Sequence, residues 1–418
     1  MNAEEQRNIV EIVLTSLHEA GVTIISLTFD GTVTNLSTAN ALGCNLKPTS
    51  TRPLKTSFQH PCAEYEVFVI LDPVHMQKLV RNTLHAQKTL VTQNGLAQWS
   101  YIEKVNDLQN RTGNLLAPKL TDKHVNFQNS KMKVSLAVQV LSQSVATALK
   151  VLRASDDSFA DSEATEEFIS VFNDIFDIFN SMNSDAQNFK QPLSKKNFEL
   201  YHHAFEYLEE YIKNIKLLDG TPILTSRNKT GFLGYIVNIH SFRKMYQIYI
   251  EENKLIEELF TYRCSQDHIE MFFGTIRAKG GCNNNPSSTE FKASYKRLIS
   301  NNEITCSAKA NCSQFDDTKA LFACFIKMPS SQFKKSMRVQ DYPSLESPEP
   351  SKNSAEPSET DNFFNAALES YASNVHKKLL AKIECDECME SLVADNSLLI
   401  TAVCKTADNE FKVFNFLL

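Results

Sequence analysis

Residues 22–31 read Val-Thr-Ile-Ile-Ser-Leu-Thr-Phe-Asp-Gly. The β-branched and aromatic side chains in this run predict a buried strand that ends at Phe29. Residues 1–20 carry apolar side chains at helical spacing and predict a helix that leads into the strand. Ligands collect at the carboxyl ends of strands in open α/β sheets, so Asp30 is well placed for chemistry. An Asp-Gly pair after a strand is also an ordinary turn, and by itself it decides nothing.

A second strand and a long helical region follow. Residues 67–71 (Val-Phe-Val-Ile-Leu) predict another buried strand, and Asp72-Pro73 then supplies an N-cap and a first-turn proline for a helix. From about residue 100 to 260 strand signals nearly vanish, and the apolar periodicity of residues 168–179 indicates helices. The predicted fold class is α/β plus α, with a helical domain inserted into the α/β part.

The C-terminal part is predicted to be a linker and a small tail unit. Residues 343–361 are rich in Pro, Ser and Glu, which is typical of a disordered linker. Beyond it, Cys385 and Cys388 have the spacing of half a zinc site, with Cys404 as a conceivable third ligand. The alternative is a pair of small, buried cysteines at a helix end.

Composition restricts the class of protein. Ten cysteines without regular spacing, no apolar run of membrane-spanning length and no signal peptide predict an intracellular protein without a membrane partner. The net charge of -6 gives no global reason to bind nucleic acid. Any contact with DNA must therefore be local.

Two acidic side chains begin a helix much later in the chain. Ser265 suits an N-cap, and Asp267 and Glu270 are three residues apart, so they share one face of that helix. Together with Asp30, such carboxylates could hold a pair of Mg2+ ions for phosphodiester chemistry. The alternative is a solvated first turn in which the helix dipole favours acidic residues.

The residues around Asp267 and Glu270 favour the metal site over a solvated first turn. The helix Asp-His-Ile-Glu-Met-Phe-Phe-Gly-Thr-Ile-Arg over 267–277 is followed by a Gly/Asn-rich turn over 280–286 and an aromatic, basic helix over 291–298. This order resembles the signature of P-element transposases and their THAP-domain-containing relatives. Further blocks resemble the family in the same order, so that the resemblance covers roughly residues 1 to 330: 27–31, 71–82, 131–134, 141–145 and 173–180.

The resemblance implies an RNase H-like catalytic domain (1–100 and 261–335) interrupted by a helical GTP-binding insertion (101–260). Composition then places the linker at 336–362 and the tail unit at 363–418. It implies DNA cleavage and strand transfer by two-metal chemistry, with Mg2+ and GTP as cofactors. Asp30 resembles the second catalytic aspartate and Glu270 the catalytic glutamate, both as metal ligands.

The same resemblance assigns the nucleotide site. Phe176, Asp177 and Asn180 resemble members of the guanine pocket, Lys119 resembles its phosphate-side lysine, and Asp267 resembles a residue near the nucleotide. A carboxylate at Asp177 could accept from the guanine N1 and N2 hydrogens, a pairing that disfavours adenine. The alternative for the phenylalanines is an ordinary helical core. The sequence contains no G-x-x-x-x-G-K-[ST] loop, so GTP is expected to act as a structural ligand.

The sequence also departs from the family pattern. A complete member begins with a zinc-binding THAP domain, a dimerisation stretch and strands that carry the first catalytic aspartate. We therefore expect a C-terminal portion without the THAP domain, inactive alone because its catalytic triad is incomplete. The alternative is a silent, domesticated transposase that binds DNA or protein and retains GTP binding. The predicted partners are DNA at transposon ends, GTP and a homo-oligomer, in the nucleus.

Overall fold

The computed structural model describes residues 2–19, 21–47, 52–131, 133–279, 286–301, 399–405 and 411–417. Its main sheet has the strand order β2-β3-β1-β8-β9. The bounds of these strands are Thr23–Phe29 (β1), Ser57–Gln59 (β2), Glu66–Leu71 (β3), Leu399–Lys405 (β8) and Phe411–Leu417 (β9). β1 and β3 are parallel, while β2, β8 and β9 are antiparallel to their neighbours.

The two strands predicted from the sequence are neighbours, and their carboxyl ends are in register. Phe29 pairs with Leu71, and the Asp72 N–H donates to the Phe29 carbonyl at 2.8 Å. Asp30 and Asp72 therefore leave the same edge of the sheet side by side. The described part of the tail, β8 and β9, extends this sheet beside β1. The predicted linker and the pair Cys385 and Cys388 lie outside the described residues.

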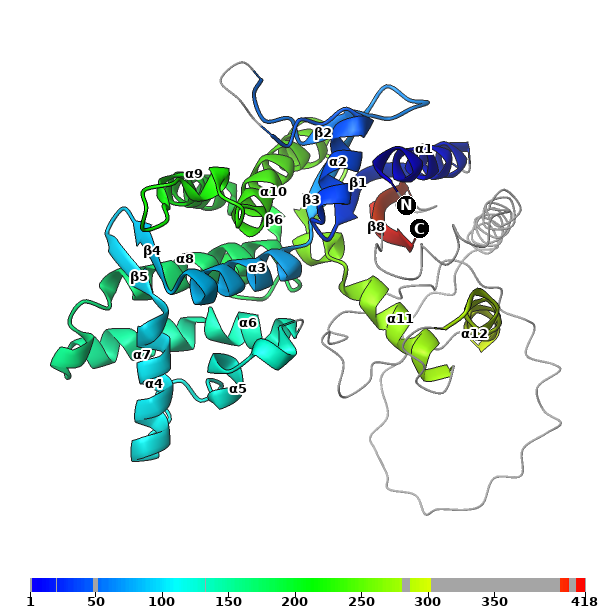
Figure 1. Ribbon diagram of the computed structural model, residues 1–418. Helices are drawn as coiled ribbons and strands as arrows, with labels where there is room; N and C mark the ends of the chain where they lie inside the picture. Colours follow the sequence, from blue (N-terminus) through cyan, green and yellow to red (C-terminus); the bar gives the residue numbers. More distant parts are fainter. Residues whose placement is uncertain are drawn as a thin grey trace, which may run out of the picture.

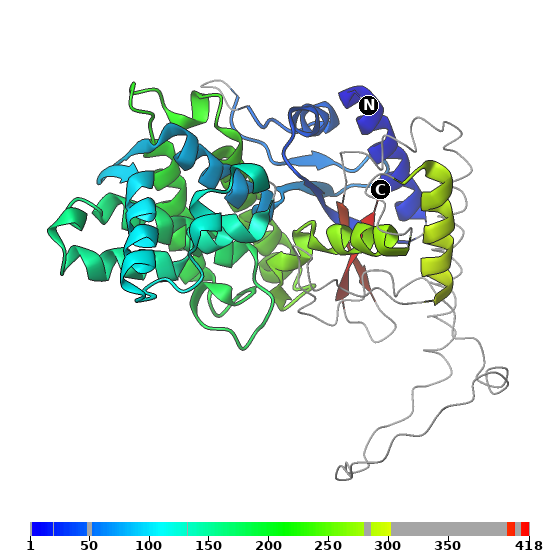
Figure 2. The same cartoon turned by 60° about the horizontal axis from the view of Figure 1, so that its bottom comes forward.

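Helices from two distant parts of the chain accompany the sheet. Thr38 Oγ1 on α2 donates to Gln6 Oε1 on α1 at 2.7 Å, which fixes these two helices to each other. Figure 1 and Figure 2 both show α11 leading from the end of the sheet toward α12. The bounds are Ala3–Glu19 (α1), Val33–Leu42 (α2), Asp267–Lys279 (α11) and Ser288–Asn301 (α12).

A helical block fills the chain between β3 and α11 (Figure 1). Its helices are Pro73–Gln87 (α3), Trp99–Thr112 (α4), Asp122–Val125 (α5), Val134–Val140 (α6), Gln143–Arg153 (α7), Glu163–Phe179 (α8), Phe198–Asn214 (α9) and Thr230–Tyr246 (α10). Its strands are Thr89–Thr92 (β4), Gly95–Gln98 (β5), Leu193–Ser194 (β6) and Glu258–Leu259 (β7). Short turns are Gln128–Ser130 (η1), Asp157–Phe159 (η2), Asn188–Lys190 (η3), Ile223–Thr225 (η4), the π-helix Gln247–Glu252 (η5) and Thr261–Cys264 (η6).

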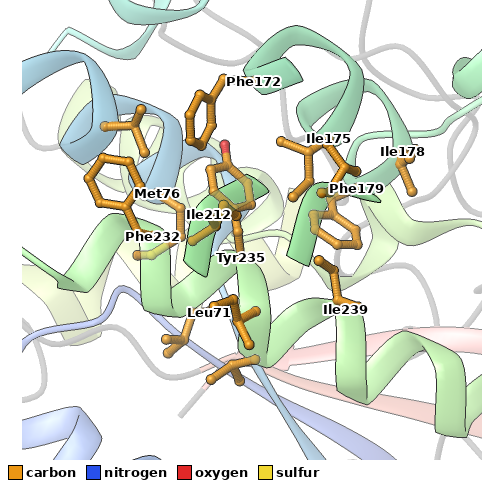
Figure 3. Packing of buried hydrophobic residues seen from close by; sticks show 14 of the residues in the cluster. Leu71, Met76, Phe172, Ile175, Ile178, Phe179, Ile212, Phe232, Tyr235 and Ile239 are labelled. Atoms are coloured by element: carbon orange, nitrogen blue, oxygen red, sulfur yellow. The ribbon is translucent and has the colours of Figure 1, made fainter. Parts of the chain in front are cut away.

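The sheet and the helical block share one continuous apolar core. On α10, the Asn238 amide bonds both the N–H and the carbonyl of Leu71, at 2.8 and 2.7 Å, so α10 is tied to the end of β3. Tyr235, also on α10, lies between Phe172 and Phe179 of α8 (Figure 3). The helical block, whose first helix is α3, therefore packs directly onto the end of β3.

Glycines allow α10 to approach α3 closely. A Cβ on Gly231 would lie 2.9 Å from Leu79 Cβ, and a Cβ on Gly234 would lie 2.7 Å from Met76 Cγ. Real Cβ atoms are not found at such distances, so Gly231 requires glycine or a shift of α3, and Gly234 requires glycine or a displaced Met76 side chain. The N-terminus of α10 is thereby held against the middle of α3.

One described stretch, Val134–Arg153, is long and apolar enough to be tested as a membrane span, with a mean hydropathy of 1.3 over its window. It is not one helix, because extended backbone at Ser142 separates α6 from α7. Half of the window is buried inside the fold. Core helices pass the same test, so this stretch is weak evidence for a span.

Candidate functional site

A single carboxylate connects three elements at the edge of the sheet. Asp72 is 1% exposed and caps α3, accepting from the His75 N–H at 3.0 Å, as the sequence predicted. The same oxygen contacts His75 Nδ1 at 2.6 Å. Its other oxygen accepts from the Gln266 N–H at 3.1 Å, directly before α11. Asp72 therefore fixes the ends of β3, α3 and α11 together, and we call this contact the Asp72 clamp.

Asp30 and Glu270 flank the Asp72 clamp. Asp30 is half-buried and accepts from the Thr32 N–H at 3.0 Å and from the Asn35 amide at 2.8 Å. Glu270 is half-buried one turn into α11, and its N–H donates to the Gln266 carbonyl at 3.1 Å. The Asp72 clamp therefore brings the two predicted metal ligands, which are far apart in the sequence, to one edge of the sheet.

Two basic side chains of α3 face these carboxylates. Lys78 is 6% exposed, and the charges of Asp72, Glu270 and Asp30 act on its ammonium, although burial is the larger effect and lowers the pKa of Lys78. Within the described residues Lys78 forms no side-chain hydrogen bond or ion pair. Burial disfavours protonated His75, but its bond to Asp72 outweighs this and raises the pKa of His75. The edge thus combines acidic groups with a buried cation.

The fit of Mg2+ to this edge follows from the donors. Asp30 and Glu270 offer hard carboxylate oxygens with partial access to water, which suits Mg2+. The oxygens of Asp72 already accept from protein groups, so Asp72 is a structural residue. In the part of the chain that the structure describes, no three His, Cys, Asp or Glu side chains group as a metal site.

The predicted guanine pocket lies at the end of α8, next to the start of α3. Phe176 is 7% exposed and packs against Val74 of α3 and Val134 of α6. Asp177 is half-buried, and burial raises its pKa to about 6 although Lys190, at 3.8 Å, opposes the shift. The Asn180 Oδ1 is buried and has no hydrogen-bond partner within the described residues. A stacking ring, a carboxylate and an unsatisfied amide are the groups that a guanine base needs.

The other two predicted nucleotide contacts are less defined. Asp267 begins α11, which follows η6, and η6 is tied to the end of α8 by the bond from the Ser181 N–H to Thr261 Oγ1 at 3.1 Å. This bond holds η6, the segment before Asp267, at the end of α8 that carries Asn180. Lys119 is exposed in the connection between α4 and α5. Among the described residues no contact connects Lys119 with Phe176, so the role of Lys119 stays a prediction.

Sequence reasoning missed Asp72, His75 and Lys78 as members of the site. The block over residues 71–82 contained the signal, because a helix that starts at Asp72 places His75 and Lys78 in its first two turns. The start of α3 lies beside Asp30 because β1 and β3 are parallel neighbours, and the sequence did not predict that pairing.

Comparisons with known proteins agree with this arrangement. Residues 1–43 match the family described as TNP-like, RNase H N-terminal domain. Residues 74–192 match the TNP-like, GTP-binding insertion domain, and residues 262–296 match the TNP-like, RNase H C-terminal domain. These matches fall on β1, the helical block and α11.

Individual relatives agree with these family matches. DNA transposase THAP9 of Homo sapiens is 27% identical over 70% of this chain, and the Transposable element P transposase of Drosophila melanogaster is 28% identical over 69%. The solved Drosophila P element transposase strand transfer complex is 27% identical, with a TM-score of 0.61, over 72% of this chain and 65% of that chain. The chain spans 32% and 37% of the length of the two curated relatives.

The fold is thus an RNase H-like domain interrupted by a GTP-binding insertion domain. The family matches, both relatives and the solved structure together support a P-element-type transposase.

Proposed function

We propose that this chain carries part of the catalytic site of a transposase, which cleaves and joins DNA strands with Mg2+ held by Asp30 and Glu270. The observation that supports this proposal is the Asp72 clamp, which holds the ends of β1 and β3 against the start of α11. When bound, the ions would activate the attacking oxygen and stabilise the leaving oxygen of a phosphodiester. Asp30 and Glu270 bind, and Asp72 keeps their two elements in place.

The surroundings of the carboxylates support an anionic substrate. Lys78 and His75 bring positive charge to the edge where acidic groups would otherwise repel a phosphodiester. Both side chains are fixed on α3, so they need no rearrangement to act there. We propose that they attract the phosphodiester and orient it toward Asp30 and Glu270.

We also propose that GTP binds at the end of α8 as a structural ligand. Phe176 would stack on the base, and Asp177 would accept from its N1 and N2 hydrogens. Asn180, Asp267 and, at the phosphate side, Lys119 complete the proposed site. The buried, unsatisfied oxygen of Asn180 supports a polar ligand at this position.

DNA cleavage tests the metal proposal. Supercoiled plasmid that carries the genomic flanks of the gene is incubated with the chain and Mg2+, and nicked product is measured. Cleavage should be lost in Glu270→Gln and in Asp30→Asn, while Asp219→Asn, a change in an exposed loop, should leave it intact. Cleavage that survives in both site variants would remove Asp30 and Glu270 from the chemistry.

Base specificity tests the nucleotide proposal independently. In Asp177→Asn the side chain offers one acceptor and one donor, which match the N1 hydrogen and the C2 oxygen of xanthine. The variant should lose GTP and gain XTP in a fluorescent-nucleotide titration. Asp174→Asn, one turn earlier on α8, serves as the matched control and should keep GTP. If Asp177→Asn still prefers GTP, Asp177 does not read the base.

A second candidate function has one observation in its favour. The described residues bring Asp30 and Glu270 together without a third ligand group, and two carboxylates alone hold a metal pair weakly. A chain that binds GTP and DNA but does not cut would fit this arrangement. In the plasmid assay it would show DNA binding and no nicking. Action at transposon ends, location in the nucleus and homo-oligomer formation remain predictions under either function.

A further inference from the structure

A cavity of about 300 Å³ lies between α3, the turn after α5 and the start of α10. The polar groups that line it include Asn82 on α3, Lys131, and Arg227, Asn228 and Thr230 next to α10. No acidic residue is among the lining residues. In a chain with a net charge of -6, a cavity with cations and without carboxylates is unusual.

The charge of the cavity is not neutralised by neighbours. Lys131 and Arg227 are exposed, and neither forms an ion pair in the part of the chain that the structure describes. His85 also lines the cavity, but burial lowers the pKa of His85, so this ring is neutral at pH 7 and offers hydrogen bonds instead of charge. The cavity therefore carries net positive charge.

A buried arginine behind the wall of the cavity adds to this charge. Arg81 is 0% exposed, and its guanidinium lies 3.6 Å above the ring of Phe127. It donates to Asn82 Oδ1 at 2.9 Å and to the Lys131 carbonyl at 3.4 Å, while its Nη1 has no partner within the described residues. Phe127, Asn82 and Lys131 all line the cavity. Burial lowers the pKa of Arg81 to about 10, so it is still charged at neutral pH.

The start of α10 supplies further donors. The Leu233 N–H bonds the Lys229 carbonyl, so the N–H groups of Thr230 and Gly231 lie in the first turn, before the helical hydrogen bonds begin. No side chain caps this helix, and both residues line the cavity. Backbone donors and cationic side chains in one place are what a phosphate group requires.

The cavity lies close to the catalytic edge. Thr230 Cγ2 lies 3.5 Å from where a Cβ on Gly31 would be, and Gly31 follows Asp30. On α3, His75, Leu79 and Asn82 follow one side of the helix at spacings of four and three residues. The rise from His75 to Asn82 is roughly 10 Å. That span is about three nucleotides at the roughly 3.4 Å axial rise of a duplex strand.

We propose that this cavity binds a backbone phosphate of the DNA strand whose reacting phosphodiester lies at Asp30 and Glu270. The inference rests on the proposed function, because it takes the sheet edge as the place of reaction. Lys131 and Arg227 hold the phosphate oxygens together with the first N–H groups of α10. The strand then follows the exposed side of α3 from the cavity to the carboxylates.

Salt-dependent binding tests the proposal. Binding of a fluorescein-labelled DNA duplex with a single-stranded 3′ overhang is followed by anisotropy, without Mg2+ so that no strand is cut. A double variant, Lys131→Gln with Arg227→Gln, should bind about tenfold more weakly at low salt, and its slope of log K against log salt should fall by about one. Lys244→Gln, an exposed lysine at the far end of α10, is the matched control and should behave as wild type.

Each outcome of the binding comparison supports or overturns the proposal. If the double variant loses DNA affinity and keeps GTP affinity, the cavity serves the DNA strand. If it loses GTP affinity and keeps DNA affinity, the phosphate belongs to a free nucleotide and the proposal is wrong. Equal DNA binding by the variant and wild type also overturns it. Absence of Mg2+-dependent cleavage in wild type would instead count against the proposed function, and the binding comparison would still judge the cavity.

Discussion

Removal of the Asp72 carboxylate should destabilise the protein strongly. In Asp72→Ala, α3 loses its N-cap, which costs about 1 kcal/mol. The Gln266 N–H is left buried without its acceptor, at about 1–3 kcal/mol, and the short contact with His75 adds about 1–2 kcal/mol. These terms share one carboxylate and do not add fully, so the free energy of unfolding should fall by about 3–5 kcal/mol.

Urea unfolding followed by circular dichroism measures this change. Asp72→Asn keeps the shape but only one acceptor oxygen, so it can serve either Gln266 or His75 and should lose roughly half as much. Asp30→Asn is the matched control at the same edge, because Asp30 is half-buried and the amide oxygen can still accept from Thr32. A loss below about 1 kcal/mol in Asp72→Ala would refute the argument that this carboxylate holds α3 and α11 to the sheet.

The same contact predicts a pH dependence. Because the pKa of His75 is raised above its usual 6.5 in the folded state, its bond to Asp72 contributes stability that is fully present below pH 6.5. This stability is lost as the pH rises through the raised pKa of His75. Asp72→Asn should flatten the dependence, and an unchanged profile in that variant would assign it to other groups.

Three further predictions concern the guanine pocket, the packing of α10 and the buried lysine. Burial raises the pKa of Asp177 to about 6, and guanine requires the charged carboxylate. GTP affinity should therefore fall about tenfold per pH unit below that pKa. A GTP affinity that stays constant from pH 5 to 8 would contradict this prediction. Gly234→Ala presses on Met76 and should lower the free energy of unfolding in urea by about 1–3 kcal/mol. Gly274→Ala meets open space and should stabilise α11 by about 0.5–1 kcal/mol. Equal effects of the two variants would refute the close approach of α10 to α3. Lys78→Met removes the cation that competes with a metal, so Mg2+ should bind roughly tenfold more tightly in a thermal-shift titration, and weaker binding would show that Lys78 supports the metal.

Local signals in the sequence predicted much of the sheet edge. The run that ends at Phe29 and the strand over 67–71 were recognisable because β-branched residues stand directly before turn and cap residues. Asp72 was recognisable as a cap because Pro73 follows it. These features depend on neighbours in the chain, and such neighbours can be read without a structure.

The functions of individual side chains were less predictable, because they depend on contacts between distant segments. The resemblance drew attention to Asp30 and Glu270, but only the Asp72 clamp explains why they share one edge. The cavity requires Lys131 and Arg227, which are far apart in the sequence, to line one space beside α3, and local sequence does not specify such a long-range contact. The pairing of β8 with β1 was also missed, since an apolar C-terminal run does not specify its partner strand.

α3 connects all three proposed binding sites. Val74 in its first turn packs against Phe176 of the guanine pocket, and His75 is held by the Asp72 clamp. Lys78 faces the carboxylates, and Asn82 lines the cavity, so one rigid helix presents side chains to base, metal and DNA strand. A ligand that orders the first turn of α3 therefore fixes the other two sites as well, because a helix of this length moves as a unit. This gives GTP a physical role without hydrolysis. Through Val74 it would stabilise the one helix on which the catalytic edge and the cavity both depend.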